Sequence, residues 1–215
     1  MFGRLTKFST DLVMLINSQR KIDDKTRVAI LPIATRKALV QSAKLAAERH
    51  LTAGTLAEIS TRITGDKLAI NIQSTWFPAI NEECFTVASL SHDRTLIASM
   101  PPSKHVSWHR LAYLNTTAKT ALLCQPVFAL FATKSNYPLS AELIADAPYL
   151  SEEIARVPAN EESISLALVH HHILMIQGIG LFIWGDNFNE ILALAETVDH
   201  WCQISLMEKS EKIYD

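Results

Sequence analysis

The stretch from Ile173 to Ser205 constrains the fold of this chain most strongly. Two apolar runs rich in Ile, Leu, Phe and Trp flank Gln177 and Gly178, which predicts two short buried strands that meet at a glycine turn. A helix is expected next, because Asn187 can cap it while Glu190 reaches back to a free amide. Apolar side chains then recur at helical spacing, at Ile191, Leu194, Ala195, Val198 and Cys202. These elements are expected to form the centre of the core.

Length and composition favour one domain preceded by an extension. The chain has 215 residues, of which 48% are hydrophobic, so it can bury one substantial core. No linker rich in Gly, Ser or Pro divides it. Residues 1–34 have mixed polarity and only a weak helical pattern, and we treat them as an N-terminal extension of unknown role. Residues 35–215 are predicted to form the domain.

Charge and cysteine content exclude several classes of protein. The net charge of -2 comes from well-mixed acidic and basic residues, so neither nucleic acid nor a membrane surface is an expected partner. Cys84, Cys124 and Cys202 are widely spaced and form no CxxC pair, which fits a reducing compartment better than a disulfide framework or a zinc knuckle. No apolar run approaches the roughly 20 residues of a membrane span. The expected location is the cytoplasm.

Strand and helix patterns alternate along the rest of the chain. Helices are predicted at residues 35–50 and 103–117, and a further helix begins after Asn160 and ends in the triple histidine His170, His171 and His172. A loop with one short helical turn is predicted between Pro138 and Pro158. Strands are predicted at residues 68–72, 85–90, 95–98 and 121–123. The first of these is expected to be half-buried, because its apolar residues alternate with polar ones. This alternation indicates an α/β or α+β fold.

Four short motifs occur in one order along the chain. The first is Leu51-Thr52-Ala53-Gly54-Thr55-Leu56-Ala57, and the second is Pro102-Ser103-Lys104-His105 with His109 four residues later. The third is Cys124-Gln125-Pro126, and the fourth is Gln177-Gly178 ahead of a long helix. With these motifs, residues 35 to 206 resemble the class II aldolase/adducin family. That family carries Leu-Thr-x-Gly-Asn-x-Ser-x-Arg, Pro-Ser-Ser-Glu, His-x-His and His-Gly at the corresponding places.

The resemblance implies a fold and an assembly. Members of the family have a three-layer α/β/α domain, in which helices cover both faces of a mixed, largely antiparallel sheet. They commonly form homo-oligomers, often fourfold-symmetric tetramers, and closed symmetry is usual for soluble chains. We therefore expect this fold and a homo-oligomer such as a tetramer.

The resemblance also implies a metal site, which the substitutions in this chain break. Active members hold a divalent metal, usually zinc, with the Glu, both histidines of His-x-His and the late His, and the metal polarises a sugar carbonyl. Those places hold His105, Cys124, Pro126 and Gln177 here. Proline has no ligand atom, and glutamine is a poor zinc ligand beside histidine. No metal or other cofactor is expected, and no catalytic residue is assigned.

A remnant of the ligand pocket is still expected. Its walls would be His105, Cys124 and Gln177, with Ser74, Ser103 and Lys104 at the rim. The family's substrate-phosphate positions are also altered, to Thr55, Ala57, Gln73-Ser74 and Lys104. Because the Glu position is now a histidine, the pocket is predicted to be neutral or cationic. Lys104 and the amides of the turn after Pro102 would then bind a small phosphate or carboxylate weakly.

Two functions from different classes remain open. The first is a non-catalytic protein, kept for ligand sensing or assembly, as the adducin branch of the family shows is possible. The second is an enzyme, a lyase or an epimerase acting on a small sugar phosphate. It would use a metal site rebuilt from His105, Cys124 and a residue of the triple histidine, or metal-free chemistry. The metal content of the purified protein separates the two.

Overall fold

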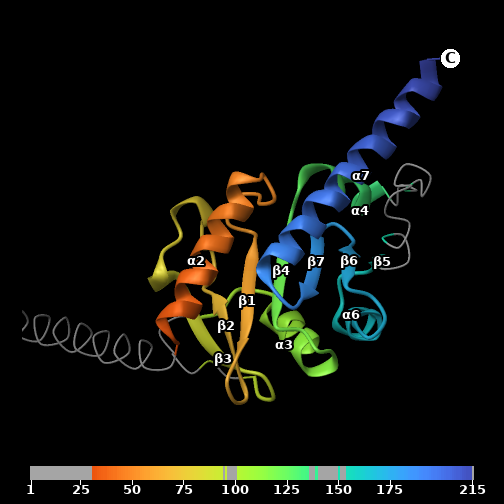
Figure 1. Ribbon diagram of the computed structural model, residues 1–215. Coiled ribbons are helices and arrows are strands. Elements are labelled where there is room, and N and C mark those ends of the chain that lie inside the picture. Colours follow the sequence, from red (N-terminus) through yellow and green to blue (C-terminus); the bar gives the residue numbers. More distant parts are fainter. Residues whose placement is uncertain are drawn as a thin grey trace, which may run out of the picture.

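The computed structural model describes residues 31–93, 95, 101–135, 139, 150 and 154–214, the last six as backbone only (Figure 1). The described strands are β1 (Glu58–Ile63), β2 (Lys67–Asn71), β3 (Phe85–Ser89), β4 (Thr120–Cys124), β5 (Ile154–Val157), β6 (Ile173–Ile176) and β7 (Gly180–Gly185). The described helices are α2 (Ile33–Glu48), α3 (Val106–Asn115), α4 (Val127–Ser135), α6 (Glu161–Leu168) and α7 (Phe188–Tyr214). Two 3-10 turns, η1 (Phe77–Ala79) and η2 (Glu82–Cys84), lie between β2 and β3.

The seven strands form a single mixed sheet in the order β3-β2-β1-β4-β7-β6-β5. Adjacent strands pair antiparallel, except β5 and β6, which pair parallel. The predicted hairpin at the centre of the core is β6 and β7, joined at Gly178, whose φ of +70° suits glycine. The predicted mixed, largely antiparallel sheet is therefore confirmed.

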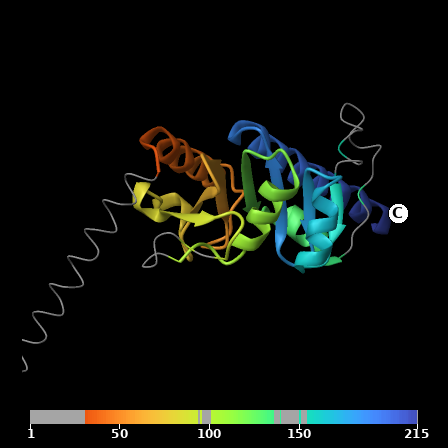
Figure 2. The same ribbon diagram turned by 90° about the horizontal axis from the view of Figure 1, so that it is seen from below.

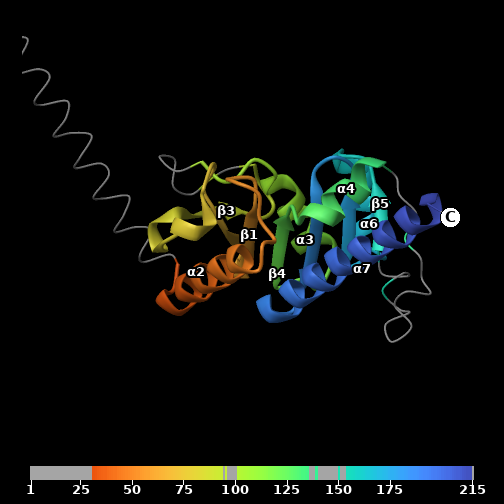
Figure 3. The same ribbon diagram turned by 90° about the horizontal axis from the view of Figure 1, so that it is seen from above.

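Helices cover both faces of this sheet. Alternate side chains of β4 and β7 point to opposite sides, so Leu122 and Ile183 pack against α2, α4 and α7, whereas Leu123 and Phe182 pack against α3 and α6. Figures 2 and 3 show α2 and α7 on one side of the sheet and α3 and α6 on the other. Because β2 is also covered on both faces, four of its five residues are buried, where a half-buried strand was predicted.

The caps of two helices follow the sequence prediction. The side chain of Asn160 accepts a hydrogen bond from the amide of Ser163 and starts α6. The side chain of Asn187 accepts one from the amide of Glu190, whose carboxylate reaches back to the amide of Asp186 at the start of α7. Both helices therefore begin where their capping residues predict.

Some of the predicted helices, strands and loops are wrong, and others lie outside the described residues. The helix predicted to end in the triple histidine stops at Leu168, so His170 to His172 lie in the connection to β6. Strand β5 lies inside the segment predicted to be a loop, because pairing with β6 outweighs its weak local pattern. Of the strand predicted at 95–98, only Thr95 is described, in an isolated bridge with Ala88. Most of the N-terminal extension also lies outside the described residues, although Leu31 is fully buried in the core.

Within the part of the chain that the structure describes, no helix is long and apolar enough to cross a membrane.

Candidate functional site

A pocket of about 130 Å³ lies where the start of β1 meets the start of α3, and we call it the β1–α3 pocket. Four of the six predicted ligand-binding residues line it: Ser74, Ser103, Lys104 and His105. Thr55, Leu56, Ala57, Glu58, Asn71 and Gln73 complete its described lining. The second motif and the residues around the first therefore come together in space.

The other two predicted residues do not line this pocket. Cys124 is fully buried in the core on the α2, α4 and α7 side of the sheet. Gln177 lines a separate pocket, together with Thr133 and Arg156. The residue of the third motif that approaches the β1–α3 pocket is Gln125, whose amide nitrogen donates to the carbonyl oxygen of Leu56.

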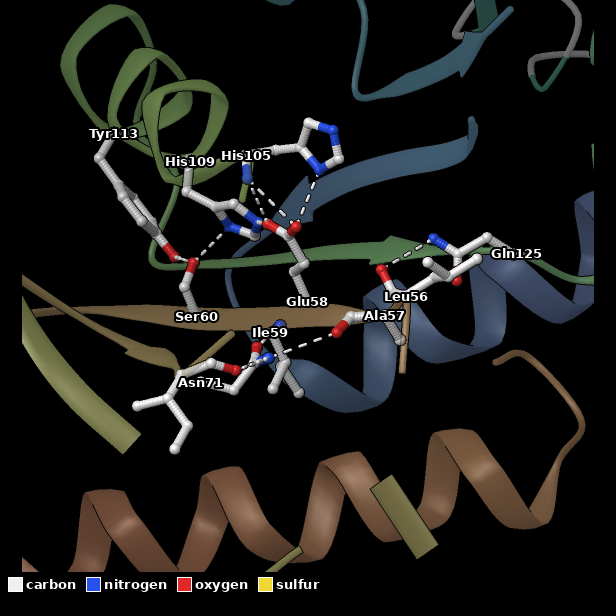
Figure 4. A network of polar contacts seen from close by, with 11 residues as sticks. Leu56, Ala57, Glu58, Ile59, Ser60, Asn71, His105, His109, Tyr113 and Gln125 are labelled. Carbon is white, nitrogen blue, oxygen red and sulfur yellow. Dashed lines mark hydrogen bonds and ion pairs between the residues drawn. The ribbon is translucent and has the colours of Figure 1, made fainter. Parts of the chain in front are cut away.

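The carboxylate of Glu58 occupies the N-terminal end of α3. It accepts two hydrogen bonds from His105, one from the ring nitrogen Nδ1 at 2.8 Å and one from the backbone amide, which lies 3.2 Å from both carboxylate oxygens (Figure 4). His109 Nε2 lies 3.5 Å from the second oxygen. The Glu58 side chain is only 4% exposed. A buried carboxylate thus takes the place that a bound anion would take at a helix N-terminus.

The contact continues inward as a buried polar chain. Ser60 Oγ lies 2.7 Å from His109 Nδ1 and 2.7 Å from the hydroxyl oxygen of Tyr113 (Figure 4). Ser60, His109 and Tyr113 are all at most 1% exposed. His109, predicted to be a core histidine, is therefore confirmed in the core, where Ser60 and Glu58 face its two ring nitrogens.

Two periodicities bring these residues together. Glu58 and Ser60 are two apart on β1, so both side chains point to the α3 face of the sheet. His105, His109 and Tyr113 are four apart at the start and along α3, so they form one stripe facing β1. Two residues of β1 therefore face three residues at the start of α3 and along it. Neither the strand spacing nor the helix spacing alone predicts that these two faces meet.

Burial and hydrogen bonding act against each other on Glu58. Burial alone would raise its pKa, but the hydrogen bonds from His105, the 3.5 Å contact with His109 Nε2 and the charge these rings can carry lower it from 4.5 to about 2. Glu58 is therefore ionised at neutral pH. The prediction did not include this carboxylate from β1, which returns a negative charge beside the position where the family has its Glu and offsets the positive charge of Lys104.

Two of the predicted backbone donors are already used within the protein. The amide of Ser103 donates to the carbonyl oxygen of Asn71, and the amide of His105 donates to Glu58. Neither is free for an anion. The hydroxyl of Ser103 is different, because it is buried and has no hydrogen-bond partner within the described residues. Ser103 and the exposed Lys104 are therefore the available donors of the second motif.

Asn71 lines the pocket but serves the backbone. Its side-chain oxygen accepts from the amide of Ile59 at 2.7 Å, and its nitrogen donates to the carbonyl oxygens of Ala57 and Ile72. These bonds fix the first residues of β1 against the end of β2. Asn71 therefore holds Glu58 in place rather than offering a free group to a ligand.

Glu58, Ser60 and Tyr113 were not among the predicted site residues. A signal for the first two exists in the sequence: when the family's Gly-Asn-x-Ser-x-Arg pattern is moved three residues along, its Ser and Arg fall on Ser60 and Arg62, and its Asn falls on Glu58. Tyr113 could have been found from its helical spacing to His105 and His109.

The residues at the family's metal positions do not fit a zinc site. Burial, and secondarily the charge of Asp199, raise the pKa of the Cys124 thiol, which disfavours the thiolate that binds metal. Gln177 lines another pocket, and His105 Nδ1 is bound to Glu58. In the described parts of the chain, no group of three or more His, Cys, Asp or Glu side chains is placed to hold a metal ion. No step of a mechanism is therefore assigned to a metal here.

Comparison with known proteins agrees with this architecture. An L-fuculose 1-phosphate aldolase structure superposes with a TM-score of 0.73 at 16% sequence identity, covering 85% of this chain and 90% of that one. The L-fuculose-1-phosphate aldolase of Thermus thermophilus gives 0.68 at 20% identity, with coverages of 80% and 94%. An aldolase II superfamily protein from Pseudomonas syringae gives 0.72 at 14% identity, with coverages of 87% and 79%. At such identities the superpositions show the fold alone.

Among curated protein sequences, no significant match is found. A family profile, however, matches most of the chain. The profile of the class II aldolase and adducin N-terminal domain covers residues 37–206, which include every element from most of α2 to most of α7. The chain belongs to the class II aldolase and adducin N-terminal domain family.

Proposed function

We propose that this chain is a non-catalytic member of its family that senses a small anion, of the phosphate or carboxylate class, in the β1–α3 pocket. The observation that carries the proposal is the Ser103 hydroxyl, which is buried in the pocket wall without a partner in the described residues. A buried hydroxyl without a hydrogen bond costs about 1–3 kcal/mol, which a bound acceptor would recover. Beside it, Lys104 supplies a positive charge.

The expected affinity is modest. The charges of Lys104 and Glu58 offset each other, so an anion gains little from the net field of the pocket. One hydroxyl and one ammonium donor contribute a few kcal/mol together, which corresponds to binding on the order of millimolar. A volume of about 130 Å³ limits the ligand to a small molecule or to one end of a larger one.

An NMR titration with inorganic phosphate tests the proposal. The wild type should show saturable shifts at millimolar phosphate, localised to residues 103–106. Ser103→Ala and Lys104→Ala should each weaken binding several-fold, because each removes one donor. Lys119→Ala, which removes a lysine paired with Asp186 on the surface, is the matched control. Shifts that are absent, or equal in all four proteins, would rule out this function.

A second function, enzymatic rather than sensing, is favoured by one observation. His105 lines the pocket and is held by a buried carboxylate, the arrangement in which a histidine acts as a general acid or base without a metal. The chemistry would be that of a lyase or epimerase on a small sugar phosphate. Turnover of such a substrate by metal-free protein, abolished by His105→Phe but not by removal of surface histidines such as His170, would replace the sensing proposal.

A further inference from the structure

The two ring nitrogens of His105 have different surroundings. Nδ1 faces Glu58 at 2.8 Å, while Nε2 lies on the opposite side of the ring (Figure 4). Nε2 has no hydrogen-bond partner among the described residues. The ring stacks on Trp108, with centroids 4.1 Å apart, which fixes its orientation. The His105 side chain is 16% exposed and lines the β1–α3 pocket.

Glu58 determines which ring nitrogen carries the proton. An ionised carboxylate can only accept hydrogen bonds, so Nδ1 must be the donor in the pair. In the neutral imidazole, Nε2 then holds a lone pair and can only accept. Neutral His105 is therefore an acceptor toward a ligand, whereas Ser103 and Lys104 can donate to one.

The other charged or titratable groups that face His105 do not change this assignment. Glu58 comes from β1, Lys104 precedes it in the chain, and His109 comes from the next turn of α3, where its Nε2 also points at Glu58. A ligand in the pocket therefore meets donors at Ser103 and Lys104 and an acceptor at His105, beside the polar side chains of Thr55, Gln73 and Ser74. The charges of Lys104 and Glu58 offset each other there.

We infer that the β1–α3 pocket selects oxyanions that carry their own O–H group over oxyanions of equal charge that lack one, with His105 Nε2 accepting the hydroxyl. Hydrogen phosphate, phosphate monoesters in their protonated form and 2-hydroxycarboxylates share this chemistry. This inference rests on the proposed function. An oxyanion without a hydroxyl presents a lone pair to Nε2, which loses one hydrogen bond and adds a repulsion.

Paired anions test the inference at about pH 8, where inorganic phosphate is mainly a dianion with one hydroxyl. Phosphate is compared with sulfate, and glycolate with acetate, at matched ionic strength by NMR titration. The wild type should bind the hydroxyl-bearing anion of at least one pair about tenfold more tightly. The anion without a hydroxyl loses one hydrogen bond to Nε2 and places a lone pair against it instead. Selectivity confined to one pair identifies phosphate or hydroxycarboxylate as the class.

His105→Phe is the discriminating variant. Phenylalanine keeps the stacking on Trp108, and the backbone amide still donates to Glu58, but no acceptor remains. The preference should fall to less than about twofold while weak anion binding persists. Equal binding of both anions by the wild type, with loss in Lys104→Ala, would overturn the inference and leave the proposed function standing. No binding of any anion would overturn both.

The protonation state can also be measured directly, which keeps the inference testable if His105→Phe does not fold. Long-range proton–nitrogen NMR spectra of the wild type distinguish a neutral ring protonated at Nδ1 from one protonated at Nε2. The former is expected for the neutral ring of His105, because its Nδ1 faces the Glu58 carboxylate. A neutral ring protonated at Nε2 would contradict the inference.

Discussion

The Glu58 carboxylate and the His105 ring lie 47 residues apart in the sequence and 2.8 Å apart in the structure, between Oε1 and Nδ1. His105 stands where the resemblance places the family's metal-binding Glu, and Glu58 restores a carboxylate at that place from the neighbouring strand. The negative charge of Glu58 is used inside the protein, because its carboxylate accepts hydrogen bonds from the ring and the backbone amide of His105 and caps α3.

The first prediction concerns the pH dependence of stability. Folding lowers the pKa of Glu58 from 4.5 to about 2, so the ionised carboxylate stabilises the folded state above pH 4.5. This contribution, about 3 kcal/mol, should be lost as the pH falls from about 4.5 toward 2. Glu58→Gln should therefore be less stable than the wild type near neutral pH, and the difference should shrink in acid.

Urea unfolding at several pH values measures this difference. Glu83→Gln, which changes an exposed glutamate, controls for the loss of one carboxylate. A Glu58→Gln protein that is as stable as the wild type at neutral pH would show that the buried pair does not stabilise the fold.

The second prediction concerns the amide side chain behind Glu58. Asn71→Leu leaves the amide of Ile59 and the carbonyl oxygen of Ala57 without their partner inside the protein. We expect a loss of about 2–4 kcal/mol in the free energy of unfolding. Asn115→Leu, which removes an exposed hydrogen bond to Ser165, should cost less than about 1 kcal/mol. Similar losses in the two variants would contradict the role given to Asn71.

The third prediction concerns the hairpin between β6 and β7. Gly180 has a φ of +140°, and a Cβ there would collide with the carbonyl oxygen of Cys124 on β4. Gly180→Ala should therefore destabilise the protein by at least about 3 kcal/mol or prevent folding. At Gly178, with φ of +70° and open space around it, alanine should cost only about 1 kcal/mol. Thermal or urea unfolding of both variants measures the contrast.

The fourth prediction concerns metal content. Because the residues at the four family ligand positions do not meet in one pocket, we expect no stoichiometric zinc or manganese in the purified protein. Elemental analysis after purification without chelators measures this. About one metal per chain, lost in the double variant His105→Ala, Cys124→Ser, would show a rebuilt site and favour the enzymatic function.

The fifth prediction concerns assembly. The family resemblance and the general preference for closed symmetry lead us to expect a homo-oligomer such as a tetramer. Light scattering coupled to size exclusion should give a mass that is a multiple of the chain mass at micromolar concentration. A monomer under these conditions would exclude an assembly role that depends on self-association.

Local patterns were sufficient for much of the fold. The glycine turn before β7 and the caps at Asn160 and Asn187 follow from residue types that need only their sequence neighbours. Strand β5 shows the limit of such patterns, because four residues with a weak signal become a strand only when β6 lies beside them.

For the candidate site, too, the sequence predicted one part and the tertiary structure decided the rest. The sequence by itself determined that Ser103, Lys104 and His105 follow a proline turn at the start of a helix. Altered metal ligands remain a prediction from the family resemblance. Only the tertiary structure decided that Glu58 meets His105, that Ser103 keeps a hydroxyl without a partner among the described residues, and that Cys124 and Gln177 lie outside the pocket. The physical reason is that hydrogen bonding, burial and charge depend on which faces of β1 and α3 meet, and this contact joins segments far apart in the chain.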